Sequence, residues 1–154
     1  MAKQNTRCGL KQCLEIGQTC TVFNLRKASR AVTQLYEEIM KPSGILPTQF
    51  TLLVATRNRG PITISSMAEV LVMDRTTLTR NLKPLIRDGL LKVATGKDQR
   101  SREVSLTPRG LQTLEQAIPL WSEAQRKIRK SLGTDRLDQL LGDLKAVVSA
   151  AGTS

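Results

Sequence analysis

The sequence contains no histidine among its 154 residues. Histidine is the commonest general base and the commonest zinc ligand, so its absence argues against most hydrolytic and zinc-dependent enzymes. The sequence also has no Gly-rich phosphate loop, no G-x-S-x-G nucleophile motif and no cluster of carboxylates or metal ligands. We therefore expect a protein that is not an enzyme and that uses no cofactor.

Cysteines are few, and long hydrophobic runs are missing. Cys8, Cys13 and Cys20 are odd in number and match no zinc-binding spacing, which argues against a secreted disulfide framework. No apolar run approaches the roughly 20 residues needed to span a bilayer, and the N-terminus lacks the apolar segment of a signal peptide. We expect a cytoplasmic protein that does not bind membranes.

Aromatic and acidic residues are scarce as well. Aromatic residues make up 3% of the chain and hydrophobic residues 40%, so we expect a mainly aliphatic core. The 24 Lys and Arg residues outnumber the 13 Asp and Glu residues, which gives a net charge of +11. Such an excess suits a polyanionic partner such as nucleic acid or an anionic membrane. It is concentrated in residues 74–102, where basic side chains outnumber acidic ones.

Residues 73–89, MDRTTLTRNLKPLIRDG, predict a helix with two distinct faces. Asp74 is suited to cap this helix, and Leu78, Leu82 and Leu85 recur on one side of it. The opposite side carries only basic and hydroxyl residues: Thr76, Thr79, Arg80, Lys83 and Arg87. Arg and Lys bind phosphates and guanine, and Thr binds a phosphate or a thymine methyl group. An ordinary solvated surface would also explain an isolated basic helix, and the neighbouring elements decide against it.

The elements before this helix predict a helix-turn-helix. We expect helices over about 18–40 and 47–59, a short strand at 62–64, and then a short helix that Ser66 opens with an S-x-x-E capping box. Two short helices joined by a tight turn, the second with a basic face, form a helix-turn-helix arrangement. No secondary structure is assigned before about residue 14.

A β-hairpin is predicted directly after the basic helix. Two alternating runs, 91–93 and 103–106, flank a Gly-containing loop that is rich in Lys and Arg. A hairpin beside a helix-turn-helix is a wing, and its basic tip can enter the minor groove, where negative potential attracts Arg. The alternative is a solvated hairpin with a charged tip, which the preceding basic helix disfavours.

Two amphipathic helices should follow the wing, one opened by Thr107 and Pro108 and one starting at Thr134 or Asp135. With the first long helix they carry more apolar surface than the winged region can cover, which favours packing between subunits. We expect a mainly α (α+β) fold: a winged helix-turn-helix with a helical dimerisation region, about six helices and a two- to three-stranded β wing. The expected parts are a basic N-terminal arm (1–17), the dimerisation region (18–46 and 107–152) and a DNA-binding domain (47–106).

Three stretches resemble motifs of a known family. DRTTLTRNLKPLIRDGL at 74–90 resembles a recognition helix, DQRSREVSLT at 98–107 a wing signature of the form D-x-R-S…L-T, and TQFTLL at 48–53 the start of a second helix. The family is the MarR family of winged-helix transcriptional regulators, and the resemblance covers nearly the whole chain. It implies a homodimer that binds a pseudopalindromic operator in double-stranded DNA, usually as a repressor. Release often follows binding of a small aromatic acid or oxidation of a cysteine.

The resemblance also implies which residues contact DNA. Four residues of the recognition helix would face bases and phosphates in the major groove: Arg75, Thr76, Thr77 and Arg80. In the wing, Arg100 would probe the minor groove and Asp98 would orient the loop, while Lys97 and Arg102 would support phosphate contacts. Thr79 and Lys83, on the same basic face, complete the expected set.

The cysteines are possible redox sensors. The peroxide-sensing branch of the family has a reactive cysteine near the start of its first helix, and Cys20 is similarly placed. The tyrosine partners expected there are not evident, since Tyr36 is the only tyrosine, and an inert buried cysteine is the alternative. Cys13 and Cys20 would lie about 10.5 Å apart along a continuous helix, which is too far for a disulfide. A disulfide would therefore use Cys8 or cross between subunits.

Two further alternatives stay open. A basic adaptor that coats nucleic acid without reading its sequence would have the same charge, and a competition between a promoter fragment and random DNA would separate the two. The ligand pocket of the family lies between the dimerisation helices and the DNA-reading domain. Trp121 occupies a core-like position, and we expect it to pack at the dimer interface rather than stack on a ligand.

Overall fold

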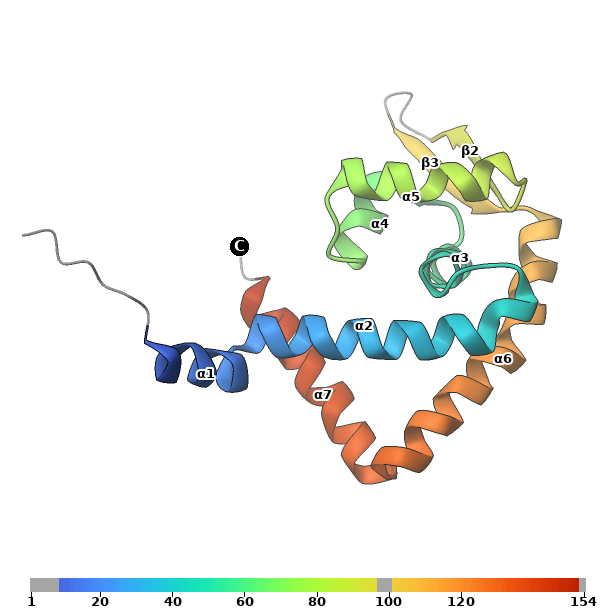
Figure 1. Cartoon of the computed structure of the whole chain (residues 1–154). Coiled ribbons are helices and arrows are strands. Elements are labelled where there is room, and N and C mark those ends of the chain that lie inside the picture. The colour runs from blue at the N-terminus through green and yellow to red at the C-terminus, as the bar shows by residue number, and fades with distance from the viewer. Residues whose placement is uncertain (1–8, 97–100, 153–154) are drawn as a thin grey trace, which may run out of the picture. The chain divides into compact units, whose positions relative to one another are not determined.

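The computed structural model describes residues 9–96 and 101–152. These residues form seven α-helices, one 3-10 helix and a three-stranded sheet (Figure 1). The elements are α1 (Leu10–Thr19), α2 (Thr21–Met40), η1 (Lys41–Ser43), α3 (Pro47–Arg59), β1 (Ile62–Thr63), α4 (Ile64–Val70), α5 (Arg75–Arg87), β2 (Leu91–Thr95), β3 (Arg102–Leu106), α6 (Pro108–Leu132) and α7 (Thr134–Ala151). The predicted fold class, a mainly helical chain with a small β wing, is confirmed.

The chain divides inside α2 into two units, residues 1–35 and 36–154. In the first unit, α1 buries none of its residues and ends at Thr19, and the C-cap residue Cys20 has an extended backbone. Most of this helix falls within the expected basic arm (1–17), where no secondary structure was predicted before about residue 14. The helix is nevertheless explained by local pairs, because Leu10 and Leu14, and likewise Lys11 and Glu15, lie one turn apart.

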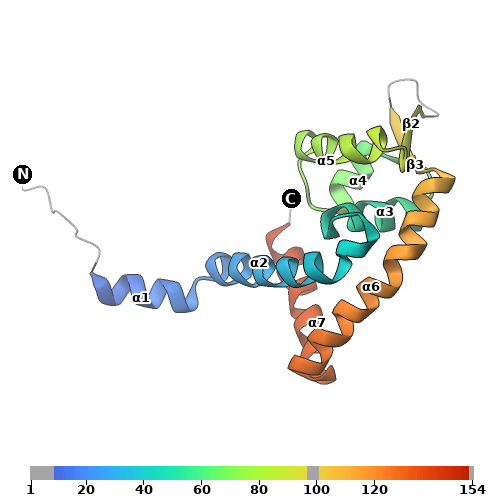
Figure 2. The same ribbon diagram turned by 45° about the vertical axis from the view of Figure 1, so that its right-hand side comes forward.

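The core of the second unit is aliphatic, as the composition predicts. Leu78, Leu82 and Leu85 of α5 are at most 1% exposed, as are Leu53 of α3 and Val104 of β3. The sheet has the strand order β1-β3-β2, and both neighbours of β3 are antiparallel to it. Figures 1 and 2 both show α5 and the β2–β3 hairpin at the end of this unit that lies far from the turn between α6 and α7.

The short helix α4 begins earlier than the sequence analysis expected. Its N-cap is Thr63, whose hydroxyl oxygen accepts a hydrogen bond from the backbone N–H of Ser66 at 3.1 Å. The S-x-x-E pattern that begins at Ser66 is therefore not the cap. A threonine at the end of β1 caps the helix first, so α4 starts at Ile64 and the predicted strand shortens to two residues. No helix in the described part of the chain is long and apolar enough to cross a membrane.

Candidate nucleic-acid interface

Helix α5 begins at the N-cap that the sequence predicts. The Asp74 carboxylate accepts a hydrogen bond from the backbone N–H of Thr77 at 2.8 Å. Hydrogen bonds from the Thr77 side chain and from the Thr77 backbone N–H stabilise the charged form and lower the pKa of Asp74. Pro84 lies inside the helix, yet α5 continues to Arg87.

The C-terminal end of α5 is tied to the start of α6. Gly89 has a left-handed backbone (φ +70°), and its carbonyl oxygen accepts a hydrogen bond from the Thr107 hydroxyl at 2.7 Å. The Thr107 oxygen in turn accepts from the N–H of Gly110 at 2.9 Å, which caps α6 as predicted. A Cβ atom at Gly110 would overlap the carbonyl oxygen of Leu90. These contacts fix the position of the start of α6 relative to the end of α5.

The face of α5 opposite its buried leucines is basic and exposed. Arg75, Arg80 and Lys83 are exposed, and no described acidic side chain lies within salt-bridge distance of them. Their charge is therefore available to an external anion. Arg87 differs, because its guanidinium bonds the Asp88 carboxylate at 2.9 Å. That bond raises the pKa of Arg87 and lowers the pKa of Asp88.

The threonines of α5 are not equivalent. Thr76 is exposed, whereas Thr77 is half-buried at the cap. The Thr79 hydroxyl donates to the Arg75 carbonyl oxygen at 2.7 Å, so its proton is already engaged. Thr79 therefore offers its methyl group and an acceptor oxygen, which suits contact with a base better than donation to a phosphate.

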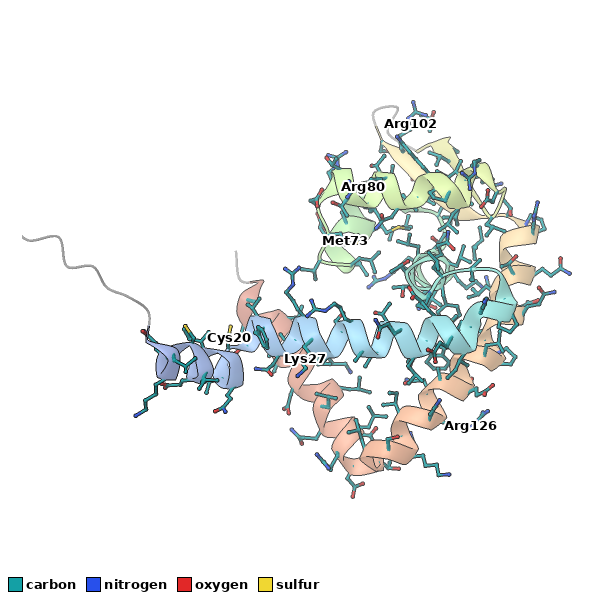
Figure 3. All side chains as sticks on the ribbon, in the orientation of Figure 1. Cys20, Lys27, Met73, Arg80, Arg102 and Arg126 are labelled. Atoms are coloured by element: carbon teal, nitrogen blue, oxygen red, sulfur yellow. The ribbon has the colours of Figure 1, made fainter. Side chains whose placement is uncertain are left out.

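The register of the hairpin places Arg102 on the helix-facing side of the sheet. Thr95 pairs with Arg102, Val93 with the buried Val104, and Leu91 with Leu106. Because side chains alternate along a strand, Arg102 shares a face with Val104. Arg102 lies at the strand end nearest the wing tip and is exposed. Figure 3 shows Arg80 and Arg102 at the same end of the second unit. The other expected wing residues, Lys97, Asp98 and Arg100, lie outside the described residues.

Residues 43–101 match the model of the MarR family. The organic hydroperoxide resistance transcriptional regulator of Bacillus subtilis is 30% identical over 99 residues, which are 64% of this chain and 67% of that protein. The chain belongs to the MarR family. The family and the fold are those of DNA-binding transcriptional regulators, which are not enzymes.

Solved structures agree with this assignment of the chain to the MarR family. The M. tuberculosis transcriptional regulator MosR, in complex with DNA, is 34% identical with a TM-score of 0.75, over 86% of this chain and 98% of MosR. A mutant E. coli MarR complexed with operator DNA is 26% identical with a TM-score of 0.78, over 86% of this chain and 97% of that chain. The chain spans about two thirds of the length of two curated B. subtilis relatives.

The described cysteines of this MarR-family chain lie in its first unit. Cys13 is exposed on α1, and Cys20 is half-buried at the junction of α1 and α2, where Figure 3 labels it. Cys20 is a free thiol. Cys8 lies outside the described residues, so a disulfide through Cys8 stays a prediction.

The structure shows two side-chain contacts that were not predicted from the sequence. Gln125 interrupts the apolar pattern of α6, and the structure shows that its side-chain oxygen accepts a hydrogen bond from the Tyr36 hydroxyl at 2.6 Å. Phe50 stacks on Trp121, with ring centroids 6.3 Å apart. Three of the four aromatic residues of the chain, Tyr36, Phe50 and Trp121, take part in these contacts. Their small number in the sequence was the only feature that drew attention to them.

Proposed function

We propose that the chain is a homodimeric, sequence-specific DNA-binding repressor that a small molecule or thiol oxidation releases from its operator. The observation that supports this most is the exposed basic face of α5, where Arg75, Arg80 and Lys83 have no acidic partner among the described residues. Unpaired Arg and Lys side chains can bind phosphates and base edges at little cost. Arg102 lies at the same end of the unit (Figure 3).

The proposed contacts follow the expected set, refined by the structure. Arg75, Thr76 and Arg80 contact bases and phosphates in the major groove, and Thr79 contacts a base with its methyl group. Thr77 supports the cap more than the contact, since its N–H bonds Asp74. Phosphate contacts come from Lys83, Lys97 and Arg102. Arg100 enters the minor groove, with Asp98 orienting the loop.

A homodimer is supported by the uncovered apolar face of α7. Leu140, Leu141 and Val148 are 42%, 40% and 51% exposed. Contiguous exposed apolar surface of this kind marks protein interfaces. A second copy covers it, and two recognition helices then read the two halves of a pseudopalindrome.

We expect Leu141→Glu to dissociate the dimer in sedimentation, and Ala146→Glu, on the opposite side of α7, to leave it intact. A dimer unaffected by Leu141→Glu would contradict this interface.

The DNA contacts are tested by substitution. We expect Arg80→Ala and Arg102→Ala each to weaken operator binding by about 5- to 150-fold, which corresponds to the 1–3 kcal/mol of a good contact. The control is Arg126→Ala, because Arg126 lies on α6 far from Arg80 (Figure 3). Wild-type affinity in both test variants, with unchanged thermal stability, would refute the assigned roles.

The alternative function, a coat protein that does not read sequence, is supported only by the net charge. A regulator should prefer one genomic fragment over random DNA by about 10³-fold or more at physiological salt. Equal competition by random DNA would favour the coat protein.

The trigger is tested at Cys20. If thiol oxidation releases the operator, an organic hydroperoxide should lower affinity and a thiol should restore it, and Cys20→Ser should abolish the response. A fully responsive Cys20→Ser protein would remove Cys20 from the mechanism and leave Cys8, Cys13 or a bound small molecule as the trigger.

A further inference from the structure

The net charge of the chain is concentrated in two separate segments. Residues 1–35 contain six basic residues and one acidic residue, and residues 74–102 contain eight basic residues and three acidic ones. Each segment therefore carries a net charge of +5, and together they account for nearly all of the total of +11. The second segment holds α5 and the wing. The first segment coincides with the first unit of the structure, and the proposed operator contacts do not explain its charge.

Within the first unit, α2 carries three cations on a stretch of helix without acidic residues. Arg26, Lys27 and Arg30 are exposed, and none of the acidic side chains that the structure describes lies within salt-bridge distance of them. The sequence contains no Asp or Glu between Glu15 and Glu37. Figure 3 labels Lys27 on this part of α2. The charge of these three side chains is therefore available to an external anion.

Arg26 and Arg30 lie one helical turn apart and border a hollow in the surface of α2. The hollow is lined by Leu25, Arg26, Ser29 and Arg30. The Ser29 hydroxyl forms no hydrogen bond with another described residue. Two guanidinium groups and a hydroxyl group at one hollow are donors that suit a phosphate. Like charges one turn apart also destabilise a helix, and a bound anion would remove that cost.

We propose that Arg26, Lys27 and Arg30 form a second DNA-binding surface, which contacts the phosphate backbone without reading the sequence. A duplex presents one negative charge per about 1.7 Å of its axis. Several phosphates therefore fall within the roughly 6 Å that separate Arg26 and Arg30 along the axis of α2.

DNA is favoured over other polyanions because the chain belongs to a family of DNA-binding regulators. A duplex that is bound at α5 raises the effective concentration of phosphate around the rest of the protein. This step rests on the proposed function, whereas binding of phosphate at α2 does not.

The first test uses the wild-type chain and phenylglyoxal, a reagent that modifies exposed arginine side chains. A duplex of random sequence should slow the modification of Arg26 and Arg30 at least about threefold, because bound phosphates cover them. Arg126, which is exposed on α6, should react at the same rate with and without DNA. Mass spectrometry of peptides measures the rates. Equal rates for Arg26 and Arg30 in both conditions would overturn the proposal. Slow modification in both conditions would also overturn it, because another copy of the chain would then cover them.

The second test removes the three charges together. The triple variant Arg26→Gln, Lys27→Gln, Arg30→Gln should bind operator and random DNA about tenfold or more weakly at physiological salt, and the slope of log K against log salt should fall by about one for each lost contact. The variant Arg26→Lys, Arg30→Lys keeps the charges and should keep the wild-type slope. An unchanged slope in the Gln variant, or a reduced slope in the Lys variant, would overturn the argument from charge.

A matched control exists on α6. Arg126, Lys127 and Lys130 have the same spacing as the cations of α2 and are also exposed. Acidic residues, such as Glu123 and Asp135, are interspersed with them. Because salt screens distant charges, the triple Gln variant of this segment should keep its DNA affinity within about twofold of the wild type. Equal losses in the α2 and α6 variants would show that total charge, and not the surface on α2, determines binding.

Comparison of the two DNAs separates a failure of this proposal from a failure of the proposed function. The α2 variant should lose the same factor on operator and random DNA, whereas Arg80→Ala should lose its preference for the operator. Protection of Arg26 and Arg30 by random DNA would support the α2 surface even if no operator preference were found. An anionic membrane is the other polyanion to exclude. Protection by phosphatidylserine vesicles but not by random DNA would overturn the proposal in favour of a membrane surface.

Discussion

The recognition helix α5 and the C-terminal helix α7 are both amphipathic, yet they bury their leucines to very different extents. In α5, Leu78, Leu82 and Leu85 are at most 1% exposed. In α7, Leu137 alone is buried, while Leu140 and Leu141 are about 40% exposed. The first helix satisfies its apolar face inside one chain, and the second does not.

An amphipathic pattern in the sequence does not tell whether the apolar face of a helix packs within its own chain or against another chain. A helix that must present a fixed polar face, as α5 does, needs a complete core behind it. A helix whose apolar face packs against a second chain, as we propose for α7, would leave that face open in the single chain. Burial of apolar surface is worth roughly 25 cal/mol per Å², so covering the open face of α7 would stabilise the homodimer that we propose.

The largest expected effect compares one leucine from each helix. Leu85→Ala should lower the free energy of unfolding by about 2–5 kcal/mol, because it leaves a cavity in a closed core. Leu141→Ala should change the stability of the isolated chain by less than about 1 kcal/mol, since the side chain is already solvated. Urea denaturation at low protein concentration measures both. Equal losses of unfolding free energy in the two variants would contradict the proposed difference between the helices.

The close contact between α6 and the end of α5 gives the next effect. Gly110→Ala forces a Cβ atom against the Leu90 carbonyl oxygen. We expect a loss of about 1–3 kcal/mol in unfolding free energy, as for other overpacked sites. Gly142→Ala is the control in α7, where an added Cβ meets nothing within 4 Å. It should be neutral or stabilising, and a comparable loss there would show that the contact with Leu90 is not the cause.

A smaller effect of opposite sign is expected at the turn before α5. Val72 has a left-handed backbone (φ +51°), which is unfavourable for a β-branched residue, and its side chain is 68% exposed. Val72→Gly should therefore raise the unfolding free energy by about 0.5–1 kcal/mol, because it relieves this strain and loses little packing. Val70→Gly, inside the neighbouring helix α4, should lower it. Destabilisation by Val72→Gly would mean that the turn tolerates valine without strain.

The smallest effect is the pH dependence of the α5 cap. The folded-state pKa of Asp74 is lowered by its hydrogen bond to Thr77. Its stabilising contribution is thus fully present above the ordinary carboxyl pKa of about 4 and is lost as the pH falls through the lower, folded value. Asp74→Asn keeps a capping oxygen and removes the charge. We expect its melting temperature to fall less steeply with acid than that of the wild-type chain. Identical acid profiles would assign the effect to other carboxyls.

Several elements could be predicted because their signals are local. Asp74 and Thr107 cap the helices that the sequence assigns to them, and the wing strands pair as the alternation of Val93 and Val104 indicates. Two local predictions were wrong. The N-cap of α4 is Thr63 and not Ser66, because both residues can cap a helix and Thr63 comes first. Most of α1 was not predicted, because its apolar residues are few and lie in the basic N-terminal segment. Of the expected contact residues, the structure brings Arg75, Arg80, Lys83 and Arg102 to one end of the second unit, while their roles on DNA stay predictions.

What the sequence determined by itself is the set of elements and the basic face of α5, because helix caps, helical spacing and strand alternation depend on residues a few positions apart. Only the tertiary structure decided where Tyr36, Phe50 and Trp121 meet, and that Thr107 joins α6 to the end of α5. Those contacts link residues from separate elements, and no local pattern encodes them. They exist because closure of the aliphatic core around Leu53 and Leu85 brings α3, α5 and α6 together.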